Sequence, residues 1–126
     1  MQLDQAMRQI FKSIRLPKEF QEIERIIEAF ANEYFEQNRA MLLTQSKGWN
    51  NENVALLAKS ILILNTTLHS EKVPKSLKLS KQSYVKTNRS ILNDIVDENY
   101  LNGIYDRIQS KPFESKIDLS EKHFRR

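Results

Sequence analysis

The sequence predicts an all-α fold of about five helices. Glycine occurs only twice and proline three times in 126 residues, so tight turns are few. Apolar residues recur at the three- and four-residue spacing of amphipathic helices in several long segments. Asparagine, serine or aspartate stands directly before three of these segments, where such side chains favour helix initiation. Together these observations favour helices over strands.

A proline separates the first two predicted helices. The first is expected to end before Pro17, because the residue that precedes a proline is disfavoured in a helix. Its apolar face carries Leu3, Met7, Ile10, Phe11 and Ile14. The second helix is predicted to end near Asn38. Its apolar face carries Phe20, Ile23, Ile27, Phe30, Tyr34 and Phe35.

A third helix is predicted after a loop over residues 45–51, with Asn51 as its N-cap. Its apolar face carries Val54, Leu57, Ile61, Leu64 and Leu68. The stretch 61–64 is apolar on nearly all sides, which is typical of a helix that is central and buried or partly exposed as a binding surface.

Two shorter helices complete the prediction. Residues 70–79 form a linker, after which Ser80 is expected to cap a fourth helix that runs through Arg89. Asp97 is expected to cap a fifth helix, which Pro112 closes. Residues 1–113 are thus predicted to form one helical domain, and residues 114–126 a polar, basic C-terminal tail. The apolar faces of the first three helices are broad enough to require a further covering layer.

Several function classes are not expected. The net charge of +4 is spread along the chain without a basic stripe, so no nucleic-acid partner is predicted. The chain has no cysteine and no glycine-rich phosphate loop, and His69 and His123 lie far apart, so neither a metal nor a cofactor is expected. No apolar run is long enough to span a membrane, and the first residues lack a signal-peptide core. A cytoplasmic location fits these observations.

Two polar features interrupt the apolar pattern. Glu19 lies at the junction between the first two helices, where a carboxylate stabilises a helix N-terminus by about 0.3–1 kcal/mol. Residues 64–69 read LNTTLH and place polar side chains at the end of the apolar third helix. They could end the helix by competing for backbone hydrogen bonds, or form a polar lip on an apolar groove. From the residues alone, the purely structural interpretation is the simpler one for both features.

In order and spacing, the two features resemble the signature motifs of the Sec-seven domain family. Residues 14–25 read IRLPKEFQEIER, similar to the first motif FRLPGEAQKIDR, and IIEAFA follows at 26–31. Residues 62–70 read LILNTTLHS, similar to the second motif IMLNTDLHN. The resemblance extends to Phe113. It implies that this chain folds like the C-terminal part of the right-handed helical superhelix of this family.

The resemblance implies a guanine-nucleotide exchange factor for an Arf-family small GTPase, which acts in vesicle trafficking without covalent chemistry. Glu19 would be the glutamic finger, which enters the nucleotide site beside the β-phosphate and Mg²⁺. Arg15, Pro17 and Arg25 would support the loop that carries it. The implied groove for the GTPase comprises Lys59, Ile63, Leu64, Asn65, Thr66, Leu68 and His69.

Four residues depart from the family pattern. Lys18 replaces the glycine beside the finger, and Phe20 replaces an alanine. Lys59 stands where relatives carry an aromatic residue, which implies insensitivity to brefeldin, and Ser70 replaces the final asparagine. The alternative is therefore a degenerate module that binds an Arf-like GTPase or another helical partner without efficient exchange. A third interpretation is a helical interaction domain whose motifs serve packing alone.

The family domain has about ten helices, and this chain resembles only the second half. If Met1 is the true start, self-association or a partner chain is expected to cover the faces that the N-terminal helices would bury; if the sequence is a piece of a longer protein, its own N-terminal helices would cover them. The resemblance also implies peripheral recruitment to Golgi or endosomal membranes through other regions.

Overall fold

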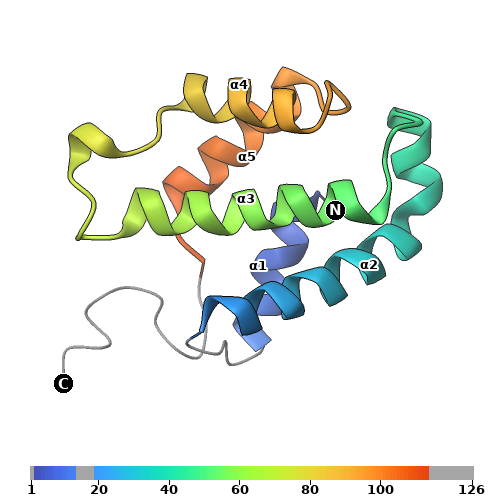
Figure 1. Cartoon of the computed structure of the whole chain (residues 1–126), viewed down its shortest axis with the longest axis horizontal. Helices are drawn as coiled ribbons and strands as arrows, with labels where there is room; N and C mark the ends of the chain where they lie inside the picture. Colours follow the sequence, from blue (N-terminus) through green and yellow to red (C-terminus); the bar gives the residue numbers. More distant parts are fainter. Residues whose placement is uncertain (1, 14–18, 114–126) are drawn as a thin grey trace.

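A computed structural model describes residues 2–13 and 19–113, and Figure 1 shows them as a helical assembly. The elements in chain order are α1 (Leu3–Ser13), α2 (Phe20–Gln45), α3 (Asn51–His69), the short 3₁₀ helix η1 (Lys75–Leu77), α4 (Lys81–Ile91) and α5 (Glu98–Ser110). No strand occurs within the described residues. The prediction of an all-α fold with five main helices is confirmed.

Side-chain caps determine where three of the helices begin. Asn50, Ser80 and Asp97 each accept a hydrogen bond from the backbone N–H three residues later, at distances of 2.8, 3.1 and 2.8 Å. Such caps satisfy N–H groups that have no partner within the helix. The predicted caps Ser80 and Asp97 are confirmed, whereas the cap of α3 is Asn50 and not Asn51.

Helix α2 is longer than predicted. The predicted end near Asn38 was wrong, because the helix continues to Gln45. Asn38 instead marks a kink, with φ −116° and ψ 15°. Its side-chain amide donates to the carbonyl of Tyr34 at 2.9 Å, and Leu42 beyond the kink is 1% exposed. Burial of Leu42 is the physical reason why the chain resumes the helix after the kink.

Helix α3 lies at the centre of the fold, in contact with α1, α2 and α5 (Figure 1). Its residues Leu57, Ala58, Ile61 and Leu64 are completely buried. Leu56 and Ile63 on the same helix remain 44% and 50% exposed. The helix is therefore central on most sides and keeps one apolar strip on the surface. None of the described helices is both long and apolar enough to cross a membrane.

Lys78, in the linker, donates hydrogen bonds to the backbone carbonyls at the C-terminus of α3. Its ammonium group donates to the carbonyls of Thr67, Leu68 and Ser70 at 3.1, 2.8 and 3.0 Å. These carbonyls lie at the negative end of the helix dipole, so a cation is favoured there.

We expect Lys78→Met, which keeps the apolar stem and removes the charge, to lower the free energy of unfolding by about 1–2 kcal/mol. Urea unfolding followed by circular dichroism measures this loss. Lys75→Met on the exposed η1 is the matched control and should change stability by less than about 0.5 kcal/mol. Equal losses in the two variants would show that Lys78 does not cap the helix.

Candidate functional site

Glu19 occupies the N-cap position of α2. Its backbone is extended, with φ −84° and ψ 132°, and its carbonyl accepts from the N–H groups of Glu22 and Ile23 at 3.1 Å. Its side chain makes no capping hydrogen bond and is exposed. The carboxylate is therefore available at the surface, directly before the half-exposed ring of Phe20. This geometry allows the charge to be presented to a partner.

The predicted supporting residues are only partly within the described chain. Arg15 and Pro17, together with Lys18, lie outside the described residues. Arg25 lies on α2 and is exposed. Its proposed role in supporting the Glu19 loop stays a prediction.

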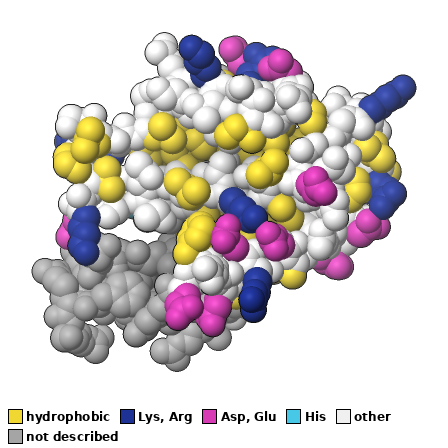
Figure 2. Space-filling view, in the orientation of Figure 1, with side chains coloured by type: hydrophobic (Ala, Val, Ile, Leu, Met, Phe, Trp, Pro, Cys, Tyr) yellow, Lys and Arg dark blue, Asp and Glu magenta, His cyan; other side chains and the backbone are white. Residues whose placement is uncertain are grey.

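A strip of apolar surface runs along α3. Leu56 and Ile63 are exposed on this helix, and in Figure 2 apolar side chains gather where α3 and α4 lie next to each other. Thr66 is also exposed. Leu56 was not among the predicted groove residues, although it stands seven residues before Ile63 and hence on the same helical face. That spacing was the signal that could have found it.

Lys59 lies between the two exposed apolar residues and bridges α3 to α2. Its ammonium group is 2.8 Å from a carboxylate oxygen of Glu28 and 3.8 Å from one of Glu24. The hydrogen bond to Glu28 raises the pKa of Lys59. Figure 2 shows basic and acidic side chains next to apolar ones on this face of the molecule. The strip is therefore interrupted by a lysine whose charge is already partnered.

Ser60 connects the strip to α4. Its hydroxyl donates to the carbonyl of Leu57 at 2.8 Å and lies 3.1 Å from the hydroxyl of Tyr84. Burial raises the pKa of Tyr84 to about 12, so this phenol stays protonated and keeps its hydrogen bond at neutral pH. The contact fixes α4 against the middle of α3.

The structure separates the predicted groove residues into two sets. Lys59, Ile63 and Thr66 lie on the outward side of α3. Leu64 and Asn65 point inward and are 0% and 3% exposed, and Leu68 is half-buried against the core. His69 is also half-buried, with its Nε2 atom 2.6 Å from the carbonyl oxygen of Ile108. In this structure Leu64 and Asn65 do not reach a surface partner, since the helical repeat places them opposite Ile63 and Thr66.

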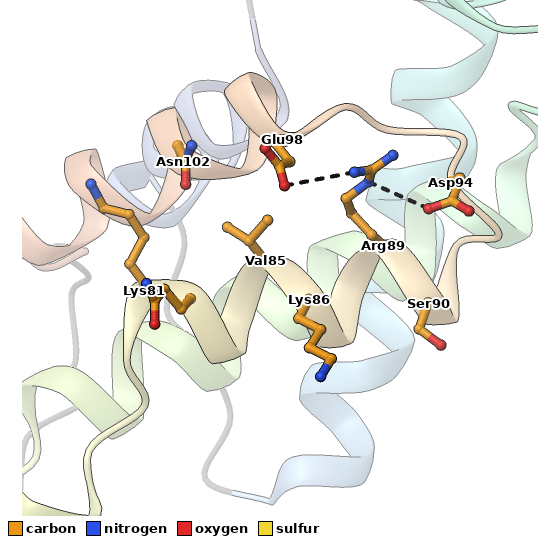
Figure 3. Close-up of a pocket in the computed structure, with 9 residues that line it drawn as sticks. Lys81, Val85, Lys86, Arg89, Ser90, Asp94, Glu98 and Asn102 are labelled. Atoms are coloured by element: carbon orange, nitrogen blue, oxygen red, sulfur yellow. Dashed lines mark ion pairs between the residues drawn. The ribbon is translucent and has the colours of Figure 1, made fainter.

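A separate hollow of about 640 Å³ lies between α4 and α5 (Figure 3). Arg89 crosses it and forms ion pairs with Asp94 at 3.4 Å and Glu98 at 3.8 Å. The hollow includes none of the predicted site residues. Across the described ranges, no group of three or more acidic, histidine or cysteine side chains could hold a metal ion.

Comparison with known proteins places these features in a family. The family model described as the Sec7 domain matches residues 1–113. The human Brefeldin A-inhibited guanine nucleotide-exchange protein 1 is 40% identical over 118 residues, which is 92% of this chain. The Schizosaccharomyces pombe ADP-ribosylation factor guanine nucleotide-exchange factor sec72 is 34% identical over 114 residues, or 90% of this chain. The chain spans about 6% of the length of each of these relatives.

Solved structures give the same result. The N-terminal Sec7 domain of RalF superimposes with a TM-score of 0.78 at 29% identity, covering 95% of this chain and 57% of that one. The catalytic domain of Sec7p gives a TM-score of 0.72 at 28% identity, covering 89% of this chain and 56% of that one. The shared fold therefore extends over nearly all of this chain and over about half of each solved domain.

Proposed function

This chain belongs to the Sec7 domain family, and from that premise we propose that it accelerates GDP release from an Arf-family small GTPase. The curated relatives are exchange proteins, and one is named for ADP-ribosylation factor. The observation that carries the proposal is the exposed carboxylate of Glu19 at the start of α2, without a capping bond of its own. Glu19 would be the glutamic finger.

Electrostatics explains how such a carboxylate would act. Beside the β-phosphate of GDP it would repel a like charge and compete for the cations that hold the nucleotide. Two unit charges at about 4 Å interact by about 4 kcal/mol near a protein surface. Because each 1.4 kcal/mol corresponds to a tenfold change in affinity, one well-placed carboxylate suffices for a large loss of GDP affinity.

The outward strip of α3 would hold the GTPase while Glu19 acts. Leu56 and Ile63 supply apolar area, and Lys59 and Thr66 supply polar contacts on the same face. Exposed apolar patches of this kind are typical of protein-binding surfaces. The proposal assigns binding mainly to α3 and nucleotide displacement to the start of α2.

GDP release from an Arf protein loaded with a fluorescent GDP analogue tests the proposal, after circular dichroism has shown that the chain is folded. We expect release to be faster in proportion to the concentration of the chain. No acceleration by a folded chain that also fails to bind nucleotide-free Arf would refute it.

One observation favours a second candidate, a module that binds the GTPase without efficient exchange. The paired Lys59 occupies the middle of the apolar strip, where a buried charge has a desolvation cost. Lys18, next to the finger in sequence, could also neutralise Glu19. This candidate predicts stable binding to nucleotide-free Arf with no acceleration of GDP release.

Brefeldin A should not inhibit exchange by this chain. The compound depends in this family on groove residues at the positions of Lys59 and Ser60, and Lys59 presents an ammonium group already bound to Glu28. We expect Lys59→Tyr, which restores an aromatic ring, to confer inhibition, whereas the conservative Lys59→Arg should not. The GDP-release assay with and without the compound measures this. Inhibition of the unchanged chain at micromolar brefeldin A would contradict the prediction.

We further propose that this activity is cytoplasmic, at the surface of Golgi or endosomal membranes, with recruitment through regions other than the described helices. Self-association or a partner chain would cover apolar surface outside the α3 strip, where Ile10, Met41 and Leu43 are 38%, 39% and 37% exposed.

A further inference from the structure

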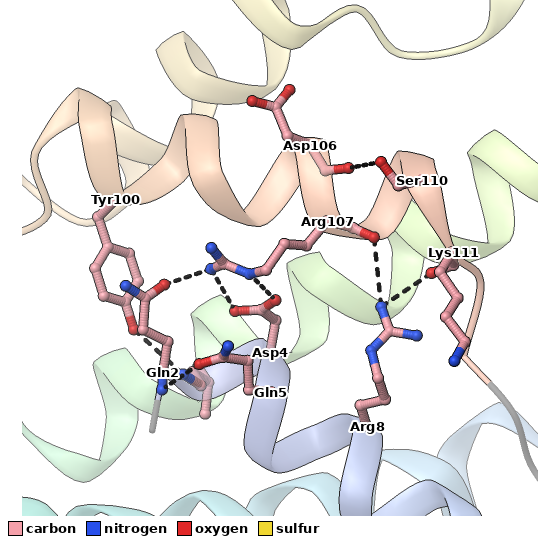
Figure 4. Close-up of polar contacts among 10 residues, drawn as sticks. Gln2, Asp4, Gln5, Arg8, Tyr100, Asp106, Arg107, Ser110 and Lys111 are labelled. Atoms are coloured by element: carbon pink, nitrogen blue, oxygen red, sulfur yellow. Dashed lines mark hydrogen bonds and ion pairs between the residues drawn. The ribbon is translucent and has the colours of Figure 1, made fainter.

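We infer that the hollow between α1 and α5 binds a phosphate group, carried by a soluble phosphate compound or by a lipid headgroup. This α1–α5 hollow has a volume of about 740 Å³, and both helices line it (Figure 4). Every lining residue is polar or charged, and α1 supplies Gln5, Arg8, Gln9 and Lys12. No residue of the proposed exchange site lines the hollow, so the inference is independent of that proposal.

The α1–α5 hollow has an excess of basic side chains. Four of its lining residues are basic and one is acidic. The acidic residue, Asp106, pairs with Lys81, which lies outside this hollow, at 2.8 Å. Among the basic residues, Arg107 pairs with the buried Asp4 at 2.7 Å. The other three cations are not matched by a further carboxylate of the lining. The potential of the hollow is therefore positive, and it attracts anions.

The guanidinium group of Arg8 is held in place beside the end of α5. It donates to the backbone carbonyls of Arg107, Lys111 and Pro112 at 3.4, 2.9 and 2.9 Å. It also lies 5.1 Å from the centroid of the Phe113 ring. A guanidinium group has five N–H donors, so these three hydrogen bonds leave two donors for a ligand. Because the group is already ordered, a ligand would lose little binding energy in fixing it.

Further donors follow Arg8 along the same face of α1. Lys12 stands four residues later, is exposed, and forms no hydrogen bond or ion pair with any part of the chain that the structure describes. The side-chain oxygen of Gln5 accepts the N–H of Gln2 at 3.0 Å, which leaves its amide NH₂ able to donate. Gln9 adds a second amide at helical spacing. This face of α1 therefore presents two cations and two amides.

A phosphate group suits this set of donors better than a single carboxylate does. Its oxygens accept hydrogen bonds from several directions, and a guanidinium group commonly binds phosphate through two parallel hydrogen bonds. The volume of the hollow lies within the range of small-molecule sites. It is large enough for two linked phosphate groups or for a phosphate on a small organic group.

The hollow between α4 and α5 provides a comparison within the same molecule. It has three basic residues but also two carboxylates, and Arg89 pairs with both of them, with Asp94 at 3.4 Å and with Glu98 at 3.8 Å. Figure 3 shows the side chain of Lys86 pointing away from these pairs. The α4–α5 hollow therefore lacks the excess charge of the α1–α5 hollow, and we expect phosphate to prefer the latter.

Titration of the full chain with sodium pyrophosphate, followed by NMR of the backbone amides, tests the inference. Low ionic strength is used because salt screens exposed charges. We expect saturable shift changes in residues 5–12 and 107–111. The Kd should be about 1 mM or below, because two or three charge-assisted hydrogen bonds suffice for that affinity. Absence of saturable changes in these residues, or changes confined to residues 81–98, would overturn the inference.

Two matched variants separate a specific site from general charge attraction. Lys12→Gln removes one cation of the α1–α5 hollow and should weaken pyrophosphate binding about 3- to 10-fold. Lys86→Gln makes the same change beside the α4–α5 hollow and should weaken it by less than about 1.5-fold. Both lysines are exposed, so both variants should fold, which circular dichroism verifies. Equal weakening by the two substitutions would overturn the inference.

Vesicle flotation identifies the source of the phosphate. The full chain is mixed with phosphatidylcholine vesicles that contain or lack phosphatidic acid. A lipid headgroup is the source if flotation requires phosphatidic acid, is competed by pyrophosphate and is reduced in Lys12→Gln, and such binding would add to recruitment through other regions. Pyrophosphate binding without this flotation identifies a soluble phosphate compound as the ligand class.

Discussion

Replacing Glu19 by lysine is expected to abolish the acceleration of GDP release, with a fall of about 100- to 1,000-fold in kcat/KM. The substitution exchanges a charge that repels the β-phosphate for one that attracts it. Removing a single preorganised electrostatic contact costs about 2.7–4 kcal/mol in other active sites, and reversing a charge should cost at least as much. Because Glu19 is exposed and makes no capping bond, the free energy of unfolding should fall by only about 1 kcal/mol, from the unfavourable placement of a cation at the positive end of the helix dipole.

The GDP-release assay at several concentrations of the chain measures this effect. Glu22→Lys is the matched control, since it makes the same change of charge on an exposed residue in the first turn of the same helix. It should lower the rate by no more than a few fold through long-range repulsion of the partner. Similar losses in both variants would show that the general charge of this surface matters and that Glu19 has no special position.

Replacing Arg107 by methionine is expected to give the largest loss of stability, about 3 kcal/mol. Arg107 on α5 donates to both oxygens of Asp4 on α1, from Nε at 2.7 Å and from Nη2 at 2.8 Å (Figure 4). Its pKa is raised by this hydrogen bond to Asp4. The Asp4 side chain is 1% exposed, so removing its partner leaves a buried carboxylate without a counter-charge. Breaking one side of such a pair typically costs 3–5 kcal/mol, and the partial exposure of Arg107 favours the lower value.

Substitution of the partner, Asp4, should lower the stability by less than substitution of Arg107. This difference between the two variants is the sharper test. In Asp4→Asn the guanidinium of Arg107, with 34% of its side chain exposed, can still reach water, so we expect a loss of about 1–2 kcal/mol. The double variant Asp4→Leu with Arg107→Met removes both charges and should recover most of the stability. Urea unfolding of the four proteins gives these values. A larger loss for Asp4→Asn than for Arg107→Met would contradict the buried-carboxylate explanation.

Local sequence signals predicted most of the fold. The caps Ser80 and Asp97 set the start of α4 and α5 as expected, because a capping side chain acts within three residues of its own position. The end of α2 was missed for the opposite reason. Asn38 does disturb the helix, but burial of Leu42 outweighs this local preference, and burial depends on residues distant in sequence.

The exposure of the candidate site residues was predictable only in part. The motif resemblance pointed to Glu19 and to the outward residues Lys59 and Ile63, all of which reach the surface. It could not show that Asn65 turns inward, since its partner is a backbone N–H at residue 113. Whether a polar residue on a helix faces solvent or the interior depends on which element packs there, and that information is tertiary.

The ion pair between Lys59 and Glu28 joins the helix that follows Glu19 to the helix that carries Leu56 and Ile63. The two helices also share an extensive contact in the core. Together these contacts restrict sliding or rotation of one helix against the other before any partner arrives. The entropy loss of fixing Glu19 relative to the apolar strip of α3 is then incurred during folding and not during association. Encounter with a GTPase would accordingly approach rigid-body docking on this side, and most of the conformational adjustment would fall to the GTPase.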